Sequence, residues 1–481
     1  MEKILNLKNT VIFVFIAVIW KIFLAGTLFL HPDEAYYWLW SKQLALSYYD
    51  HAPMIAYFIK LTTIFSDSEL AVRFSAIIAM AVLSVVIWKF VIKLFESELI
   101  ASACVILLHS MPIIFSASFI MTPDTPLFLF LSITTFFIWK FIETENGNYW
   151  YPAGLFFGLA LLSKYTAVLL LPGLAVYIIV FKKYYWFKKY QIYLSLLIAF
   201  VCFFPVVYWN YQNGWISFSY QLGHGLSSSG YKINYVFDYL GSQMLIFSII
   251  LFLPTLVAAF GYLFSKDPKK VFLASVSLST ILFYCFTALK KSPEANWPVP
   301  AYFTFAVISA KYFMEGGKTK KILFISAVIF NIAVSVIAGL HAKFTIIPLE
   351  KISKNIAKAE ATNWFYGYDK LADKLIAENI KYVLTPSHQT SAEIAFYSKN
   401  KIKTFADSKS SKKSQYDIWG KPEIFNSNDQ GAFVYEVFED RKTSPYRVDN
   451  LFKNISKEID EFEVIRHGVI VRQFKIEKVS N

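Results

Sequence analysis

Long apolar stretches alternate with short polar ones along the first 340 residues. The first stretch, about Asn9–Leu30, is longer than the apolar region of a signal peptide and has no small-residue cleavage site before His31. We therefore expect it to be a retained span. About 20 apolar residues cross a bilayer as a helix, so the pattern predicts about eleven transmembrane helices. The other ten are expected at about Ala71–Phe95, Leu99–Phe119, Pro126–Ile142, Trp150–Leu162, Thr166–Phe181, Ile192–Trp209, Tyr235–Phe264, Val271–Leu289, Trp297–Tyr312 and Ile322–Gly339.

The pattern changes after about His341 to a charged, mixed sequence that is long enough to bury a core of its own. It predicts an amphipathic helix in WFYGYDKLADKLIAENI, strands in KYVLTP, IKTFA and GAFVYEVF, and a closing hairpin in FEVIRHGVIVRQFKI with its turn at His467-Gly468. The expected fold is therefore a polytopic α-helical membrane protein with a C-terminal α/β domain. We expect the transmembrane domain over 1–343 and the α/β domain over 344–481.

Composition supports an integral membrane protein, since 56% of the 481 residues are hydrophobic and only 17% are charged. The net charge of +13 would suggest nucleic acid in a soluble chain, but here the lysines cluster between apolar stretches, where they set topology. The three cysteines lie inside apolar runs and imply no disulfide framework. With the N-terminus inside, the cytoplasmic loops receive Lys182, Lys183, Lys188, Lys189, Lys266, Lys269, Lys270, Lys311, Lys318, Lys320 and Lys321.

That topology places the remaining polar loops and the C-terminal domain together on the outer face of the membrane. One of these loops begins HPDEAYYWLW, in which Asp33 and Glu34 follow Pro32 and start a helix favourably. The aromatic residues that follow, such as Tyr37, suit a helix lying in the membrane interface. One carboxylate is enough for a cap, so we interpret the second as a base at the mouth of an outward cavity. The alternative is that both only cap the helix.

Other outer loops place further charged and polar side chains on the same face. MTPDTPL holds Asp124 between two prolines at the top of a span, where a plain N-cap is the alternative. LLSKYTAVLL places Lys164 between apolar segments, where its ammonium needs an anionic partner such as a lipid headgroup or a phosphate. KKSPEANWPVPAY contributes Glu294 and Asn296.

SYYDHAP adds Asp50 and His51, and for His51 an interface position is as reasonable as contact with a phosphate. Asp50, His51 and His224 could gather around a divalent metal, but no spacing in the sequence requires one. Paired carboxylates and buried cations beside lipid suit attack on an anomeric carbon whose leaving group is a lipid phosphate. A base takes the proton of the acceptor, and cations stabilise the departing phosphate. No nucleotide-binding motif is present.

The segments DEAYYWLWSKQLALSYYDHAPMIA, TPDTPL, LLSKYTAVLL, PEANWPVPAY and SQYDIW resemble the bacterial polyprenyl-phosphate-sugar glycosyltransferases of the GT-C fold. That group includes the lipid A aminoarabinose transferases and relatives of the protein O-mannosyltransferases. The resemblance implies inversion at the anomeric carbon and no nucleotide sugar or other cofactor. It implies that Asp33 is the catalytic carboxylate, that Asp124 is the second acidic position and that Lys164 holds the donor phosphate. Substrate contacts are expected from Glu34, Tyr37, His51, Lys164, Glu294, Asn296 and Tyr302.

One departure concerns the donor. Where the aminoarabinose transferases have a Lys-Pro-Pro phosphate contact, this chain has His51, Ala52 and Pro53, so the donor sugar stays open. The acceptor also stays open among lipid A, another envelope glycan and a protein. The lysine- and serine-rich DSKSSKKSQYDIW is interpreted as a solvated loop rather than an acceptor-binding surface.

Two other classes of protein are less consistent with the sequence. A transporter or flippase for a lipid-linked sugar should show a repeat relating its halves, which we do not see. A membrane-anchored sensor would have no use for carboxylates in its first loop.

Overall fold

The computed structural model describes residues 4–226, 230–407, 413–426, 429–437 and 452–480. The chain divides into two compact units. The first, here called the helical unit, comprises Met1–Ala25, Leu46–Ser66 and Arg73–Ile337. The second, here called the sheet unit, comprises Gly26–Ala45, Asp67–Val72 and Ala338–Asn481. The segment around Asp33 therefore packs with the C-terminal domain, although it lies between two membrane-spanning stretches in the sequence.

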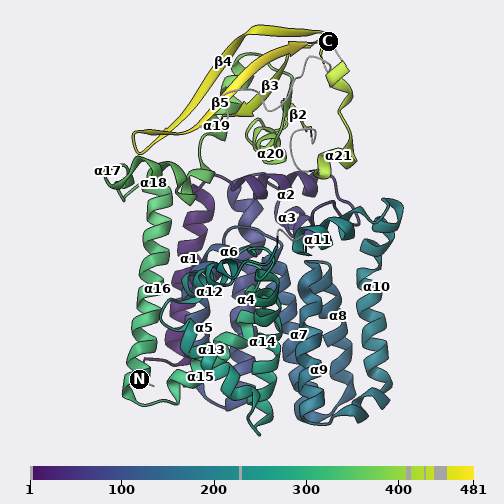
Figure 1. The fold of residues 1–481 in the computed structure, drawn as a ribbon, viewed down its shortest axis with the longest axis vertical. Helices are drawn as coiled ribbons and strands as arrows, with labels where there is room; N and C mark the ends of the chain where they lie inside the picture. Colours follow the sequence, from purple (N-terminus) through teal and green to yellow (C-terminus); the bar gives the residue numbers. More distant parts are fainter. Residues whose placement is uncertain (1–3, 227–229, 408–412, 427–428, 438–451, 481) are drawn as a thin grey trace. The chain divides into compact units, whose positions relative to one another are not determined.

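Within the described residues, six helices are long and apolar enough to cross a membrane. Large apolar side chains such as Phe15, Phe200 and Phe330 are exposed on three of them, as expected for surfaces that face lipid. Figure 1 shows α7, α8, α9 and α10 running side by side. The six are α1 (Leu7–Thr27), α4 (Glu69–Phe95), α7 (Asp124–Thr144), α10 (Tyr190–Gln212), α14 (Pro268–Ala288) and α16 (Lys318–Phe344).

The other predicted spans are shorter or broken. The stretch Leu99–Phe119 divides at Pro112, which begins a new helix because it has no N–H to continue the old one. The span expected over Tyr235–Phe264 is not one straight helix, since two helices meet there at 104°. Ser248 is extended at the break, and Pro254 lies in the first turn of the second helix. The remaining helices of the helical unit are α5 (Glu98–Ser110), α6 (Pro112–Ala117), α8 (Trp150–Leu161), α9 (Leu170–Val180), α12 (Asn234–Phe247), α13 (Phe252–Leu263) and α15 (Tyr302–Met314), together with α3 (Met54–Thr62) and α11 (Ile216–Leu226), which were not among the predicted spans.

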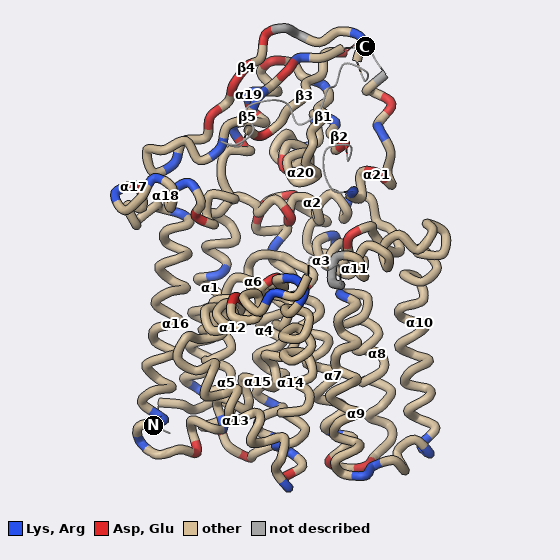
Figure 2. Tube along the Cα trace, viewed as in Figure 1, with Lys and Arg blue, Asp and Glu red and all other residues tan. Residues whose placement is uncertain are grey.

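Charged residues of the helical unit gather at the helix ends, as Figure 2 shows. At one end Lys183 pairs with Glu145 at 3.0 Å, just beyond the last turn of α7. Lys269 donates to the carbonyl of Leu94 at 2.6 Å, which brings the α13–α14 connection to the same end as the last turn of α4. Asp124 begins α7 at the opposite end, about 30 Å away at 1.5 Å per residue. The lysine clusters and Asp124 therefore lie at opposite ends of the bundle, as the predicted topology requires.

The sheet unit contains a five-stranded sheet in the order β2-β1-β3-β5-β4. β1 pairs in parallel with β2 and β3, and β5 is antiparallel to β3 and β4. The predicted hairpin turn is confirmed: His467 and Gly468 both have positive φ, as a two-residue turn between strands needs. The strands are β1 (Tyr382–Thr385), β2 (Lys403–Ala406), β3 (Gly431–Glu436), β4 (Asn454–Arg466) and β5 (Val469–Ser480).

Helices cover one face of this sheet. Leu371 and Leu375 of α19 pack with Ile394 of α20 and with Val383 and Ile476 of the strands. The predicted amphipathic helix is therefore confirmed as α19. The helices of the unit are α2 (Pro32–Lys42), α17 (Leu349–Ile352), α18 (Lys354–Ala359), α19 (Tyr368–Ala377), α20 (His388–Tyr397) and α21 (Gln415–Trp419).

The helix predicted after Pro32 is present as α2, but its surroundings differ from the expectation. Trp38 packs edge-on against Phe396 at 5.0 Å, and Tyr36 contacts His388 at 4.6 Å. One face of α2 packs on α20, and almost every side chain of the helix is buried. That the helix lies in the membrane interface stays a prediction.

Candidate functional site

A buried ion pair lies at the end of the helical unit opposite the lysine clusters. The Nζ of Lys164 donates to Oδ1 of Asp124 at 2.8 Å, and the two side chains are only 10% and 5% exposed. Asn296 Nδ2 donates to the other carboxylate oxygen, Oδ2, at 2.6 Å. Both oxygens of Asp124 are therefore engaged, and the anionic partner predicted for Lys164 is present within the protein.

The local structure fixes each member of this group. Asp124 opens α7 directly after Pro123, where the helix dipole favours a negative charge. Lys164 follows α8 with extended backbone and precedes a short 3-10 helix over Tyr165–Leu169. Asn296 follows Ala295, whose carbonyl accepts from Gln243 Nε2 at 3.1 Å.

Tyr302 supports this arrangement from behind. Its side chain is fully buried, and its hydroxyl donates to Oε1 of Gln243, the residue that holds the Ala295 carbonyl. The ring packs against Phe247 and Phe305. Through Gln243, Tyr302 is linked to the loop that carries Asn296, and its contact with the substrate stays a prediction.

The segment Ser47–Met54 lies against the same end of the bundle. The N–H of Met54 donates to the carbonyl of Leu162 at 3.0 Å, and Ser47 Oγ lies 3.4 Å from the hydroxyl of Tyr165. The Tyr165 hydroxyl in turn lies 3.0 Å from Ser217 Oγ. This chain of hydroxyl groups includes Tyr165, the residue that follows Lys164 in the sequence. Sequence reasoning missed it because its members are far apart along the chain.

His51 and Asp50 meet α11 in this region. Gln221 Nε2 donates to the carbonyl of Asp50 and lies 3.5 Å from Nδ1 of His51. Glu294, by contrast, is exposed. Burial raises the pKa of Tyr220 on α11, and the negative charges of Asp50 and Glu294 raise it further. The charges of two carboxylates therefore act on one tyrosine of α11.

Asp33 lies in the sheet unit, on α2. Its Oδ1 accepts from Gln389 Nε2 on α20 at 2.7 Å, and its side chain is 39% exposed. His31 Nδ1 lies 3.8 Å from the other oxygen, and the His31 ring stacks on Trp364 at 5.2 Å. The carboxylate is therefore oriented by the C-terminal domain and still open to solvent. Gln389 could not be found from the sequence, because nothing in its local pattern marks it.

The neighbouring Glu34 has a different environment. It is fully buried, and its Oε2 accepts the backbone N–H of His31 at 2.9 Å, which completes a capping box at the start of α2. Glu34 therefore caps α2. Its contact with the substrate stays a prediction. Tyr37 is also buried, at 7% exposure, against Tyr36 and Trp40, and its contact with the substrate stays a prediction.

Metal binding was left open for Asp50, His51 and His224, and the side chain of His224 lies outside the described residues. Elsewhere in the described chain, His341, Glu360 and His467 bring their ligand atoms within 4.8 Å of one another. The Nδ1 of His341 accepts the N–H of Ile347 at 3.1 Å, so in the neutral ring Nε2 carries the proton and offers no lone pair. Arg466 already pairs with Glu360 at 2.5 Å. This group is an ion-paired core rather than a metal centre.

The same cluster changes the pKa of its carboxylate, Glu360. Burial works to raise the pKa of Glu360, but hydrogen bonds from Thr362 and the charge of Arg466 outweigh it and hold that pKa below its usual range. The ionised form of Glu360 therefore stabilises the sheet unit.

Comparisons with known proteins agree with this architecture. The family model described as dolichyl-phosphate-mannose-protein mannosyltransferase matches residues 50–209, which include Asp124 and Lys164. The lipid A galacturonosyltransferase RgtD of Rhizobium johnstonii is 24% identical over 282 residues, which cover 58% of this chain and 59% of that protein. The match thus spans about three fifths of the relative's length.

Two crystal structures of ArnT from Cupriavidus metallidurans share the fold over 97% of both chains. The apo state superimposes with a TM-score of 0.69 at 13% identity, and the state bound to undecaprenyl phosphate with 0.65 at 12% identity. The predicted fold class and the predicted resemblance to the GT-C polyprenyl-phosphate-sugar glycosyltransferases are therefore confirmed.

Proposed function

We propose that this protein is an inverting glycosyltransferase that moves a sugar from a polyprenyl-phosphate donor to a cell-envelope acceptor, with lipid A as the first candidate. The reaction takes place on the periplasmic face of the bacterial inner membrane. The observation that carries the proposal is the buried Asp124–Lys164 pair, held by Asn296 at the end of the bundle away from the lysine clusters. The lipid A transferase relative and the undecaprenyl phosphate in the ArnT structure support this choice of acceptor and donor.

Lys164 acts on the donor phosphate. An ammonium group has three N–H donors, and one of them is directed at Asp124. The other two can donate to phosphate oxygens, and in surroundings this apolar the charge loses little strength to solvent. Asp124 is then a positioning residue, because both of its oxygens are engaged by Lys164 and Asn296.

Asp33 acts on the acceptor. Its exposed carboxylate takes the proton of an acceptor hydroxyl as that oxygen attacks the anomeric carbon of the donor. The new bond forms on the face opposite the leaving group, so the configuration inverts. The bond from the anomeric carbon to the phosphate oxygen breaks, and the electron pair leaves with the polyprenyl phosphate. Glu294 and His51 are proposed to line the path of the substrate.

The experiment is transfer by the purified protein in nanodiscs, with synthetic polyprenyl-phosphate donors carrying a hexose, a hexosamine, a pentosamine or a uronic acid. Lipid A is the acceptor, and mass spectrometry measures its gain of one sugar. The expected result is a mass gain with at least one donor, which Lys164→Ala and Asp33→Asn abolish. If sugar crosses the bilayer of proteoliposomes without any mass gain, the protein is a transporter and the proposal fails.

A protein acceptor is the second candidate, favoured by the description of the matching family model. The same donors are therefore tested with a serine- and threonine-rich peptide. Transfer to the peptide but not to lipid A would assign the protein O-glycosyltransferase activity instead.

A further inference from the structure

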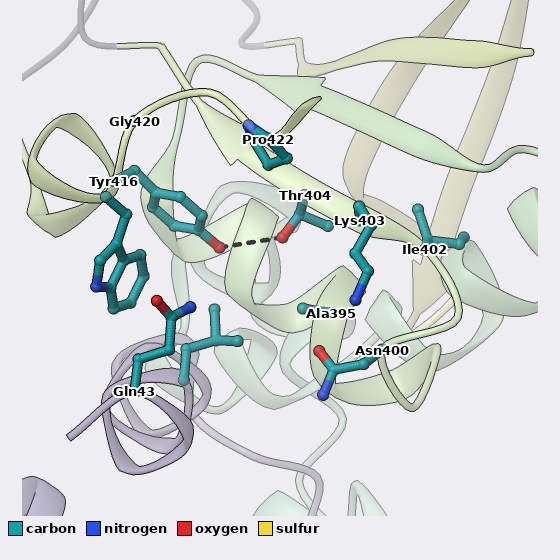
Figure 3. A pocket seen from close by; sticks show the side chains of 11 residues that line it. Gln43, Ala395, Asn400, Ile402, Lys403, Thr404, Tyr416, Gly420 and Pro422 are labelled. Carbon is teal, nitrogen blue, oxygen red and sulfur yellow. Dashed lines mark hydrogen bonds between the residues drawn. The ribbon is translucent and has the colours of Figure 1, made fainter. Parts of the chain in front are cut away.

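The sheet unit contains a pocket of about 140 Å³ that the proposed mechanism does not use (Figure 3). Its wall is formed by Tyr416 and Trp419 of α21, whose rings meet edge-on at 5.4 Å. Tyr416 is buried and its hydroxyl lies 3.1 Å from Thr404 Oγ1 on β2. A capping box between Ser414 and Asp417 fixes the start of α21. The aromatic wall is therefore rigid, and Trp419 remains partly exposed along it.

Polar side chains from three parts of the unit surround the same space. Figure 3 shows Asn400 and Lys403 on one side of this space and Gln43 of α2 on the other. No carboxylate belongs to the described residues that line the pocket. Gly420 forms part of the rim at φ 78°, and a Cβ added there would meet nothing within 4 Å. The pocket thus offers an aromatic face, two amides and a cation, with an open entrance.

We propose that this pocket binds one sugar ring of an anionic glycan, as part of the acceptor; the role as acceptor site rests on the proposed function. The indole face of Trp419 suits the C–H face of a sugar, and the amides of Gln43 and Asn400 suit its hydroxyl groups. The Lys403 ammonium suits a phosphate or carboxylate substituent. Drug-sized ligands need pockets of roughly 300–1,000 Å³, so this one admits a single ring and leaves a lipid chain outside.

Charge near the pocket favours an anionic ligand over a neutral one. Lys403 is the one charged side chain among the described residues that line the pocket. The segment SQYDIW, predicted to belong to a solvated loop, instead forms the aromatic wall. This observation favours the alternative interpretation of that segment, an acceptor-binding surface.

Binding is tested by saturation-transfer difference NMR on the full chain in nanodiscs. The probes are glucosamine 6-phosphate, glucosamine and inorganic phosphate. The wild type should transfer saturation to the ring protons of glucosamine 6-phosphate, and Trp419→Ala should weaken this binding about tenfold, whereas Trp419→Phe should largely restore it. Lys403→Gln should reduce the affinity for glucosamine 6-phosphate to that for glucosamine. Lys401→Gln is the matched control, because it removes a neighbouring exposed lysine that does not line the pocket.

A transfer assay on the same variants separates this proposal from the proposed function. Trp419→Ala should raise the KM for lipid A about tenfold and leave kcat and the donor KM unchanged. If the wild type transfers no sugar but binds the probe as described, the proposed function fails and the pocket remains a glycan site. The pocket proposal is overturned if the wild type shows no saturation transfer, if inorganic phosphate competes as well as the sugar phosphate, or if Trp419→Ala changes neither binding nor KM.

Discussion

The adjacent carboxylates Asp33 and Glu34 should respond in opposite ways to loss of charge. Asp33→Asn should lower the rate of transfer by about 10²- to 10⁴-fold, the usual cost of losing a general base. Its effect on the free energy of unfolding should stay below about 1 kcal/mol, because the side chain is 39% exposed. The amide oxygen of asparagine can also still accept the hydrogen bond from Gln389.

Glu34→Gln should give the reverse pattern. The Glu34 side chain is fully buried and accepts the N–H of His31, so the substitution weakens a cap and a charge-assisted hydrogen bond. The expected loss is about 1–2 kcal/mol of unfolding free energy. The rate per folded molecule should stay near that of the wild type, because a fully buried carboxylate takes no proton from an acceptor.

The assay combines single-turnover transfer with thermal unfolding of the same purified variants. Rates are normalised to the folded fraction, so that loss of protein is not counted as loss of chemistry. Asp33→Asn with transfer within about tenfold of the wild type would refute the general-base assignment. Glu34→Gln that is fully stable yet inactive would refute the division of roles between the two residues.

Three further predictions follow from other parts of the molecule. Lys164→Met alone should destabilise the helical unit by about 3–5 kcal/mol, because it leaves Asp124 buried without its cation. The double variant Asp124→Leu/Lys164→Met should recover most of that stability without recovering transfer. Equal losses of stability in both variants would contradict this prediction. The stabilisation from ionised Glu360 is fully present above its usual pKa of 4.5 and is lost as pH falls through its lower pKa in the folded state. Glu360→Gln should therefore reduce the dependence of the unfolding free energy on pH below about pH 4.5. An unchanged acid transition would show that Arg466 does not stabilise the charge of Glu360. A reporter fused after Lys183 should be active only in the cytoplasm and one fused at the C-terminus only in the periplasm, and a cytoplasmic C-terminus would overturn the orientation.

Local patterns in the sequence predicted the parts of the fold that depend on local chemistry. Apolar runs of about 20 residues located the six long helices, and alternation located the strands of the sheet. The break at Ser248 was missed because the residues on both sides of it are apolar. Hydropathy carries no information about the direction of the helix axis. A proline in the first turn, at Pro254, was the signal that could have placed it.

The candidate site was predictable residue by residue but not pair by pair. Asp124 and Lys164 each stood out as a charge in an apolar setting, yet 40 positions separate them and no periodicity joins them. The separation of Asp33 from Glu34 was equally out of reach, because it depends on α20, more than 350 positions away, which supplies Gln389 and buries α2. Tertiary packing therefore decided which charges are partners and which of two adjacent carboxylates stays exposed.

The buried Asp124–Lys164 pair is difficult to explain by stability alone. Moving two charges out of water costs several kcal/mol each, and well-packed apolar residues in such places are often as stable or more so. The surrounding bundle is rich in leucine and phenylalanine, so an apolar replacement would be easy to accommodate. This cost agrees with the proposed role of the pair, which is to bind the donor phosphate. Before the donor binds, the ion pair has no net charge, so no uncompensated charge is buried. When the donor phosphate binds, the ammonium can stabilise the negative charge that develops on it as the glycosidic bond breaks.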